Sequence, residues 1–324
     1  MASRAAEVRV RRARPSPLWR GWLLCLLSAA LLLVAVLVVR PFEAAGAVPD
    51  ASKWGALALV LAGVVAGVFG VGGVAARTRG LTPALIVLVL FLLAAEATLR
   101  AFAVPPGLIP TPSRIWAALL LTRAVLLQDA FVTFVQETLT GYVGGSLVGC
   151  GLAVLLVRFR FLERGLMPYA ALASSIPIVA LAPVVVKAYG LEWPSKAVIV
   201  GITVFFPVLV NVVRGLQSAN PLHLDLMRTY AVGPAGVFRL VRLPASLPFL
   251  FNALKIASTL AMIGAIVGEF FGTTGHGLGF RIQIEAGRFN LDIVWAAIVV
   301  ASVIGIAFYA LISWLETKAL GVRT

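Results

Sequence analysis

Three glutamates lie inside or at the end of long apolar stretches, where a charged side chain is costly and is therefore a candidate for function. They are Glu96, Glu137 and Glu269. Glu137 could contact a solute in a pathway across a membrane, or it could hydrogen-bond a neighbouring helix. Glu269 precedes the turn Gly277-Leu278-Gly279, and we expect it chiefly to fix that turn. In a proton-coupled carrier, Glu137 or Glu96 would carry the proton.

A second set of candidates lies in an apolar stretch that prolines interrupt. Pro177 and Pro183 fall within residues 167–186, and Ser174 and Ser175 come just before them. A proline breaks the backbone hydrogen bonds of a membrane helix, so neighbouring helices or a cavity must satisfy the freed groups. We therefore predict that these four residues line the pathway together with Glu137 and Glu269.

Metal binding and catalysis have little support. His223 and His276 fall in different loops, and Cys25 and Cys150 fall inside apolar runs, as small core residues do. The sequence lacks the metalloprotease, phosphate-loop and Ser/His/Asp patterns. We expect no metal, no cofactor and no catalytic residue.

The composition indicates an integral membrane protein. Of 324 residues, 61% are hydrophobic and 12% charged, with a mean hydropathy of +1.02. Soluble domains are roughly 45–50% apolar and about 25% charged. The apolar runs are continuous, so the spans are helices and not barrel strands. A net charge of +14 fits cytoplasmic loops and anionic lipid headgroups better than nucleic acid.

The predicted fold class is an all-α membrane protein with about eight transmembrane helices. The expected spans are 21–39, 54–76, 82–101, 130–157, 167–186, 197–213, 248–268 and 293–315. A short amphipathic helix, about 113–127, should lie in the membrane interface. A signal peptide is the alternative for the first span, but its apolar region is too long, and we favour a retained helix.

The basic residues predict the orientation. They concentrate in the tail at 1–20 and in the loops after the second, fourth and sixth spans, whereas Lys196 and other basic residues fall in the opposite loops. Because Lys and Arg mark cytoplasmic loops, both termini are expected inside.

The longest polar interruption runs from 215 to 248. It predicts two short helices that are joined at 231–234, and it ends at Leu243-Pro244. Such a loop at a membrane surface needs a reason, and we expect it to dock a cytoplasmic motor subunit.

Asp225 begins a pattern within this loop. Ala231 follows six residues later, and Leu243 and Pro244 follow at eighteen and nineteen. This resembles the "EAA" signature of the permease subunits of bacterial ATP-binding-cassette (ABC) importers, in which a Glu and a Gly stand where this chain has Asp225 and Ala231. The acid here is shorter, and the change from Gly to Ala stiffens the turn.

The resemblance extends over about residues 82–318 and points to the nitrate, sulfonate and taurine subfamily, which also includes permeases for thiamine-precursor pyrimidines and riboflavin. The residues that carry it outside the loop are Glu96 with Pro110-Thr111-Pro112-Ser113, Ser175-Ile176-Pro177, Ala182-Pro183, Tyr189-Gly190, Gly268-Glu269, Gly277-Leu278-Gly279 and Phe289-Asn290.

The resemblance implies a six-helix type I importer core at 81–320, preceded by two extra helices at 21–80 and the cytoplasmic tail at 1–20. It implies a permease dimer in the bacterial inner membrane, working with ATPase subunits that hydrolyse ATP and with an extracytoplasmic binding protein. The implied coupling residues are Asp225, Arg228, Ala231, Gly233, Leu243 and Pro244.

Two other classes remain open from the residues alone: a proton-coupled secondary carrier and a non-transporting membrane scaffold. The solute is open too, because the binding protein does most of the selecting in such importers. Sulfonate, nitrate, taurine and vitamin precursors all fit, and so do a homodimer and a heterodimer of permeases.

Overall fold

The computed structural model describes residues 18–44, 48–78, 80–173 and 176–321. Every regular element within these ranges is a helix, which confirms the predicted all-α fold class. The chain divides into two compact units, Met1–Trp116 and Ala117–Thr324.

Seven helical segments in the described residues are long and apolar enough to cross a membrane. They are Leu18–Phe42, Asp50–Ala75, Thr82–Ala101, Arg123–Arg158, Trp193–Gln217, Pro234–Phe270 and Leu291–Leu320. Each contains or overlaps one of the predicted spans, so only the span predicted at 167–186 has no single counterpart.

That stretch forms two shorter helices, α7 (Arg160–Ala173) and α8 (Ile178–Tyr189). Pro177 precedes α8 with an extended backbone (φ −67°, ψ 119°). A proline lacks the N–H that would continue a helix and disfavours helical geometry in the residue before it, so one helix does not run through this position. At 14 and 12 residues, both helices are shorter than the roughly 20 residues that a span requires. The prediction of one continuous helix here is corrected.

Two predicted boundaries also move. The amphipathic helix is α4 (Pro112–Leu121), and the next span already begins at Arg123 with α5 (Arg123–Phe131). The span expected to start at residue 248 starts at Pro234, because α11 (Pro234–Val237) continues through the π-helical turn η2 (Phe238–Arg242) into α12 (Leu243–Phe270).

The first unit contains α1 (Leu18–Ala44), α2 (Asp50–Ala75) and α3 (Thr82–Ala101). Small residues bring α1 and α2 together: the Ser28 hydroxyl donates to the carbonyl of Gly63 at 2.6 Å, and a Cβ on Gly70 would lie 2.7 Å from the Cys25 nitrogen. Close backbone approach of this kind drives helix association where no hydrophobic effect operates.

The second unit is built around α9 (Trp193–Gln217), which packs against α6 (Thr140–Arg158), α8 and α12. Val200, Val204 and Val208 of α9 are fully buried at its centre. A Cβ on Gly145 of α6 would collide with the carbonyl of Gly201, so the two helices touch through their backbones.

The last long helix, α14 (Leu291–Leu320), packs on α12. Lys255 of α12 and Glu316 of α14 form an ion pair with Nζ and Oε2 2.7 Å apart, so the charge of Lys255 has a partner within the chain.

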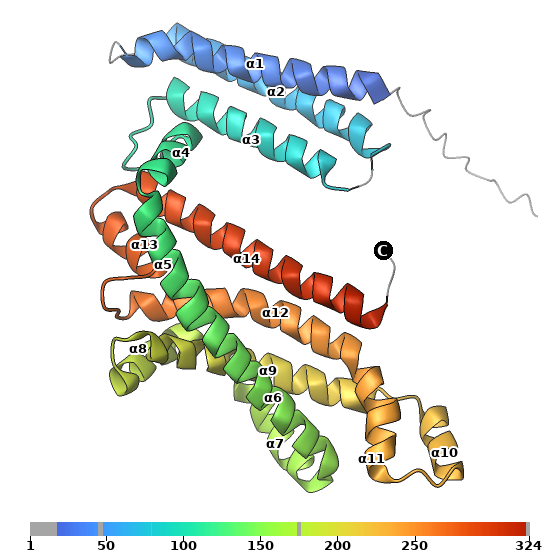
Figure 1. Ribbon diagram of the computed structural model, residues 1–324. Helices are drawn as coiled ribbons and strands as arrows, with labels where there is room; N and C mark the ends of the chain where they lie inside the picture. Colours follow the sequence, from blue (N-terminus) through green and yellow to red (C-terminus); the bar gives the residue numbers. More distant parts are fainter. Residues whose placement is uncertain (1–17, 45–47, 79, 174–175, 322–324) are drawn as a thin grey trace, which may run out of the picture. The chain divides into compact units, whose positions relative to one another are not determined.

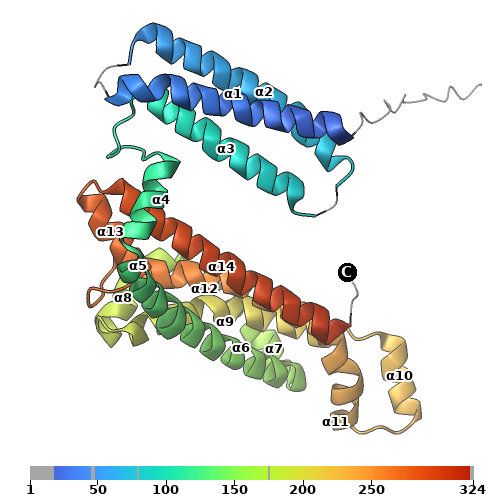
Figure 2. The same cartoon turned by 45° about the horizontal axis from the view of Figure 1, so that its top comes forward.

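Both views of the second unit place α10 (Pro221–Thr229) and α11 at one end, near the C-terminal end of α14 (Figure 1). Figure 2 shows α8 and α13 (Leu278–Gly287) at the opposite end. We call these the loop end and the far end of the unit.

Candidate functional site

The loop at 215–248 forms a helical hairpin at the loop end (Figure 1). Asn220 caps α10, because its side-chain oxygen accepts a hydrogen bond from the backbone N–H of Leu222 at 2.9 Å. Pro221 follows at the start of the helix, where the missing N–H costs nothing. The two short helices predicted on either side of 231–234 are present.

One face of α10 is apolar and uncovered by the described residues. Leu222, Leu226 and Tyr230 recur every four positions, so they share a face, and they are 72%, 48% and 73% exposed. α10 buries none of its residues. An exposed apolar strip on a charged helix marks a surface for a partner.

Asp225 and Arg228 pair with each other beside this strip. Their Oδ1 and Nη1 atoms are 2.8 Å apart, and both side chains are largely exposed. An exposed pair at this spacing contributes only about 0.3–0.5 kcal/mol. Neither charge is therefore needed to hold the hairpin, and both are accessible.

Ala231 ends α10 in a left-handed conformation with φ of +52°. The N–H of Val232 donates to the carbonyl of Met227, and the N–H of Ala231 donates to that of Arg228, both at 2.9 Å. This is the Schellman pattern, whose left-handed position is usually glycine because a Cβ is strained there. The geometry explains why a glycine suits this position in the signature and what its replacement costs.

Gly233, Leu243 and Pro244 lie where the hairpin joins the membrane helix. Gly233 precedes α11 with an ordinary φ of −66°, and a Cβ there would meet nothing within 4 Å. Pro244 is the second residue of α12, which begins directly after the π turn η2. A proline cannot donate to the preceding turn, and a π turn is one way for a helix to absorb that loss. Leu243-Pro244 therefore marks a bend between the hairpin and α12.

The far end holds a second polar group, the far-end polar cluster, which consists of Asp129, Thr133, Glu137, Lys196, Glu269 and Arg281. Glu269, at the end of α12, accepts hydrogen bonds from the Thr133 hydroxyl at 2.5 Å and from the N–H groups of Gly279 at 2.5 Å and Phe280 at 3.2 Å. Its expected role in fixing the glycine-rich turn agrees with these contacts.

Asp129 holds the same turn from α5. Its carboxylate accepts from the N–H of Gly277 at 3.0 Å and from Nε of Arg281 at 2.9 Å, while the N–H of Leu278 donates to the Thr133 hydroxyl at 2.8 Å. The side chains of Asp129, Thr133 and Glu269 therefore fix this turn in place.

Glu137 lies in the π-helical segment η1 (Val132–Leu139) and interacts with Glu269. It is buried, and its Oε2 has no hydrogen-bond partner among the described residues. The structure thus brings together two of the six predicted pathway residues. π-helical turns inside α-helices are frequent at functional sites.

Lys196 corrects a prediction. The sequence predicts Lys196 in a loop, but α9 begins at Trp193, and Lys196 is fully buried in its first turn. Its Nζ donates to the carbonyls of Leu191 at 2.5 Å and Glu192 at 3.3 Å, and its charge lies within electrostatic reach of Glu137 and Glu269. Burial of a cation requires such compensation.

Sequence reasoning missed Asp129, Thr133, Lys196 and Arg281. One signal was available: Asp129, Thr133 and Glu137 recur every four residues and so line one face of a helix. Nothing local to the sequence indicated that Lys196 or Arg281 faces this stripe.

The other predicted pathway residues do not join the cluster. Ser174 and Ser175 lie outside the described residues. Pro177 and Pro183 are exposed at the start and in the middle of α8. Their role in a pathway stays a prediction.

Glu96 stabilises the start of α4. Its Oε1 accepts from Nε of Arg100 and from the Ser113 hydroxyl, both at 2.6 Å, and its Oε2 accepts from the Ser113 N–H at 2.9 Å. A carboxylate at the first turn of α4 satisfies an unpaired N–H and the helix dipole. Glu96 and Ser113 of the recognised pattern therefore pin the proline-rich connection between α3 and α4.

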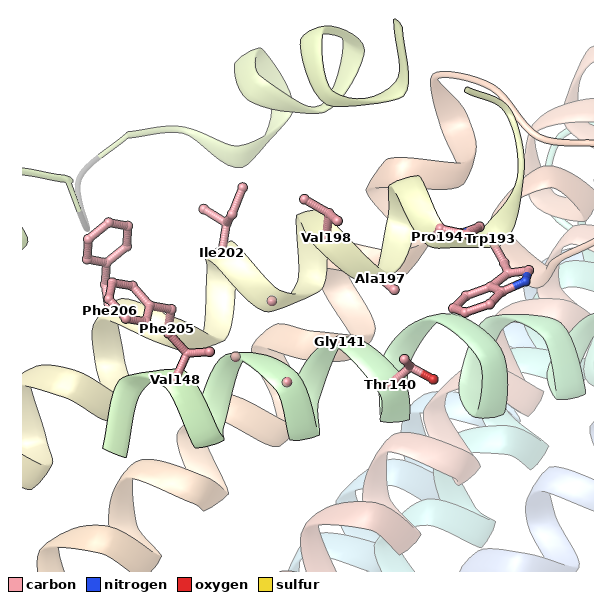
Figure 3. A pocket seen from close by; sticks show the side chains of 13 residues that line it. Thr140, Gly141, Val148, Trp193, Pro194, Ala197, Val198, Ile202, Phe205 and Phe206 are labelled. Carbon is pink, nitrogen blue, oxygen red and sulfur yellow. The ribbon is translucent and has the colours of Figure 1, made fainter. Parts of the chain in front are cut away.

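A large apolar groove of about 700 Å³ runs between α6 and α9 (Figure 3). Val198, Ile202 and Phe206 of α9 line it, with Trp193 and Thr140 close to one end. Its walls supply no charged group, so it suits an acyl chain or an apolar helix better than a polar solute. Among the described residues no group of three metal-ligating side chains occurs.

The chain matches known transport proteins. A family model described as binding-protein-dependent transport system inner membrane component matches residues 142–320, more than half of the chain. A probable ABC transporter permease of Haemophilus influenzae is 34% identical over 74% of this chain and 96% of its own length. A formylaminopyrimidine transport permease of Halalkalibacterium halodurans is 32% identical over 67% and 87%.

The fold has a counterpart among solved structures. The inward-facing MetNI methionine ABC transporter contains a chain that superposes with a TM-score of 0.53 at 19% identity, covering 62% of this chain and 98% of that one. These matches confirm the family that the loop pattern and the proline and glycine motifs resembled. The chain belongs to the family of inner membrane components of binding-protein-dependent transport systems and is a multi-pass permease of the ABC importer class.

Proposed function

We propose that this permease couples to a separate ATPase through the 215–248 loop, with Asp225, Arg228, Ala231, Gly233, Leu243 and Pro244 as the coupling residues. The observation that supports this is the uncovered face of α10, where Leu222, Leu226 and Tyr230 are exposed beside the Asp225–Arg228 pair. The ATPase hydrolyses ATP, and the permease contributes no catalytic residue.

The coupling is mechanical. The hairpin joins α9 through residues 218–220 and joins α12 through α11 and η2. Closure of an ATPase dimer moves α10, and α9 and α12 carry the displacement as rigid helices to the far end, where they hold Lys196 and Glu269. In this scheme the far-end polar cluster is where the pathway opens and closes.

The loop end lies on the cytoplasmic side, and both termini are cytoplasmic. Support comes from the excess of Lys and Arg in the tail and in the loops of that side. Burial of Lys196 strengthens the asymmetry, because this residue drops out of the basic residues counted on the opposite side.

Family membership implies an ATPase and a substrate-binding protein as partners in general. We propose further that two permeases, identical or homologous, form the pathway at their shared interface within the lipid bilayer. We place the exposed Pro177 and Pro183, at the start and in the middle of α8, along this pathway, with Glu137 and Glu269 at its outer end.

The solute is a small organic or anionic molecule. The relative that is named for formylaminopyrimidine supports a vitamin-precursor class, whereas sulfonate, nitrate and taurine stand on the subfamily resemblance. The secondary-carrier and scaffold alternatives lose their support with the family assignment.

The test is Asp225→Arg in cells that carry the complete importer. Uptake should be lost while membrane insertion is unchanged, because the substitution reverses the charge that faces the ATPase. Asp50→Arg is a matched control, since Asp50 also forms an exposed pair three residues along a helix, with Lys53 at 2.9 Å. Normal ATP-dependent uptake by Asp225→Arg would exclude the coupling role.

A further inference from the structure

A polar notch of about 310 Å³ opens beside the coupling hairpin. Three elements supply its charged and polar groups: Glu163 and Arg164 come from α7, Gln217 ends α9, and Arg242 ends η2. Leu224 of α10 adds an apolar wall. The notch therefore joins the hairpin to the start of α7, a segment that the loop pattern does not include.

The charges in the notch are unbalanced. Glu163 is already engaged, because Nε2 of Gln217 donates to its Oε1 at 2.6 Å. Arg164 and Arg242 form no hydrogen bond or ion pair with any residue that the structure describes. Each guanidinium offers a planar fork of N–H donors whose geometry matches a carboxylate.

The position of the notch indicates which partner brings the carboxylate. Leu224 forms one of its walls and belongs to the same short helix as the uncovered Leu222 and Leu226. Leu224 lies two positions from each of them and therefore faces the other side of α10. Because α10 buries none of its residues, a protein that receives the whole helix in a groove contacts the notch side as well as the apolar strip. A lipid headgroup would match the positive charge but would leave the strip exposed to water.

We propose that the notch binds an acidic side chain of the ATPase subunit, held between Arg164 and Arg242. This inference rests on the proposed coupling function and adds a second contact to it. The contact ties α7 to the ATPase, so ATPase movement reaches the broken α7–α8 segment directly as well as through α9 and α12.

The test uses the assembled complex. Affinity-tagged permease is purified with its ATPase, and ATPase retention is titrated against NaCl for Arg164→Glu, Arg242→Glu and the double variant. Each single reversal should weaken the association by about tenfold and reduce its salt dependence, because a charge pair at the rim of an interface is lost. Arg242→Lys should recover part of the affinity, since it keeps the charge but not the planar fork.

Arg239→Glu is the matched control, because Arg239 lies in the same π turn, is exposed and does not line the notch. If Arg239→Glu weakens the complex as much as Arg242→Glu does, general electrostatics explains the effect and the notch proposal fails. Size-exclusion profiles of all variants identify any variant that is misfolded. If Arg242→Glu is misfolded, Arg242→Gln replaces it.

The remaining outcomes separate this proposal from the coupling role. If Asp225→Arg releases the ATPase and the notch variants do not, the notch is overturned and the coupling loop stands. If neither does, both fail. If the wild-type complex in vesicles of pure phosphatidylcholine is as weak as the notch variants, and added phosphatidylglycerol strengthens only the wild type, a lipid phosphate occupies the notch and the proposal is overturned.

Discussion

The two ends of the second unit treat their charged residues in opposite ways. At the far end, Asp129, Glu269 and Lys196 are buried, and each has hydrogen-bond partners within the chain. At the loop end, Asp225 and Arg228 are exposed, and among the described residues their side chains pair only with each other. Apolar residues show the same contrast, since Leu278 is fully buried at the far end while Leu222 is 72% exposed at the loop end.

The far end is stabilised by contacts within one chain, whereas the loop end presents its groups to another protein. A buried charge that loses its partner costs several kcal/mol, so Asp129, Glu269 and Lys196 need the partners that they have within the chain. An exposed helix face costs little in the isolated subunit and becomes favourable only when another protein covers it. Four experiments would break or sharpen this comparison.

The largest expected difference in stability is between two variants that each remove one acidic side chain, one at the far end and one at the loop end. Asp129→Ala should lower the free energy of unfolding by about 3–5 kcal/mol, because Arg281 and the N–H of Gly277 lose their acceptor in a buried site. Asp225→Ala should change it by less than about 0.5 kcal/mol. Thermal unfolding of the purified protein in detergent measures both, and equal losses would contradict the comparison.

Gly277→Ala tests the far end by placing a Cβ against the carboxylate of Glu269. A Cβ on Gly277 would lie 2.5 and 2.6 Å from the two carboxylate oxygens of Glu269. Gly275 supplies the control, because it also has positive φ but its Cβ would meet nothing within 4 Å. Gly277→Ala should destabilise the protein by about 2 kcal/mol more than Gly275→Ala. Matching melting temperatures would show that Glu269 can move aside.

Replacement of Leu222 and Leu226 by Ser tests the loop end. Because both side chains are exposed, the stability of the isolated permease should stay within about 0.5 kcal/mol of the wild type. Association with the ATPase should weaken at least about tenfold, since apolar anchors dominate binding energy. Pull-down of the ATPase measures the second effect, and a large loss of stability without the partner would show that this face is already covered.

The smallest effect is expected at Ala231. Ala231→Gly should stabilise the hairpin by about 0.5–1 kcal/mol, because it removes a Cβ from a left-handed residue and offsets the entropy that glycine adds to the unfolded chain. Gly233→Ala, at an ordinary φ, should bring no comparable strain. Slower hydrogen exchange at the N–H of Val232 would report the gain, and an unchanged rate would argue against strain at Ala231.

Much of the fold was predictable because a bilayer imposes strong constraints on a sequence. Continuous apolar runs located the seven helical spans, and the polar break at 215–248 located the hairpin. The stretch at 167–186 was misjudged as one helix because hydropathy does not register the backbone preference imposed by Pro177. The span predicted to start at residue 248 starts at Pro234, because the π turn η2 keeps the helix continuous into α12.

The two candidate sites also differ in how much of each could be predicted from the sequence. Asp225, Ala231 and Pro244 are close in sequence, so their spacing was enough to identify the loop. The far-end polar cluster joins residues more than a hundred positions apart, such as Asp129 with Arg281 and Thr133 with Glu269. Only Glu137 and Glu269 were singled out, because an acid in an apolar run is conspicuous by itself.

By itself, the sequence determined that this is a helical membrane protein, where most spans lie, and which loop carries the coupling pattern, because each of these depends on hydropathy or on spacing within a short segment. The tertiary structure alone decided that Lys196 is buried within electrostatic reach of two glutamates, that Asp129 and Thr133 hold the glycine-rich turn, and that Arg164 and Arg242 share a notch. These three features depend on which helix faces pack together, and the tertiary fold determines that packing.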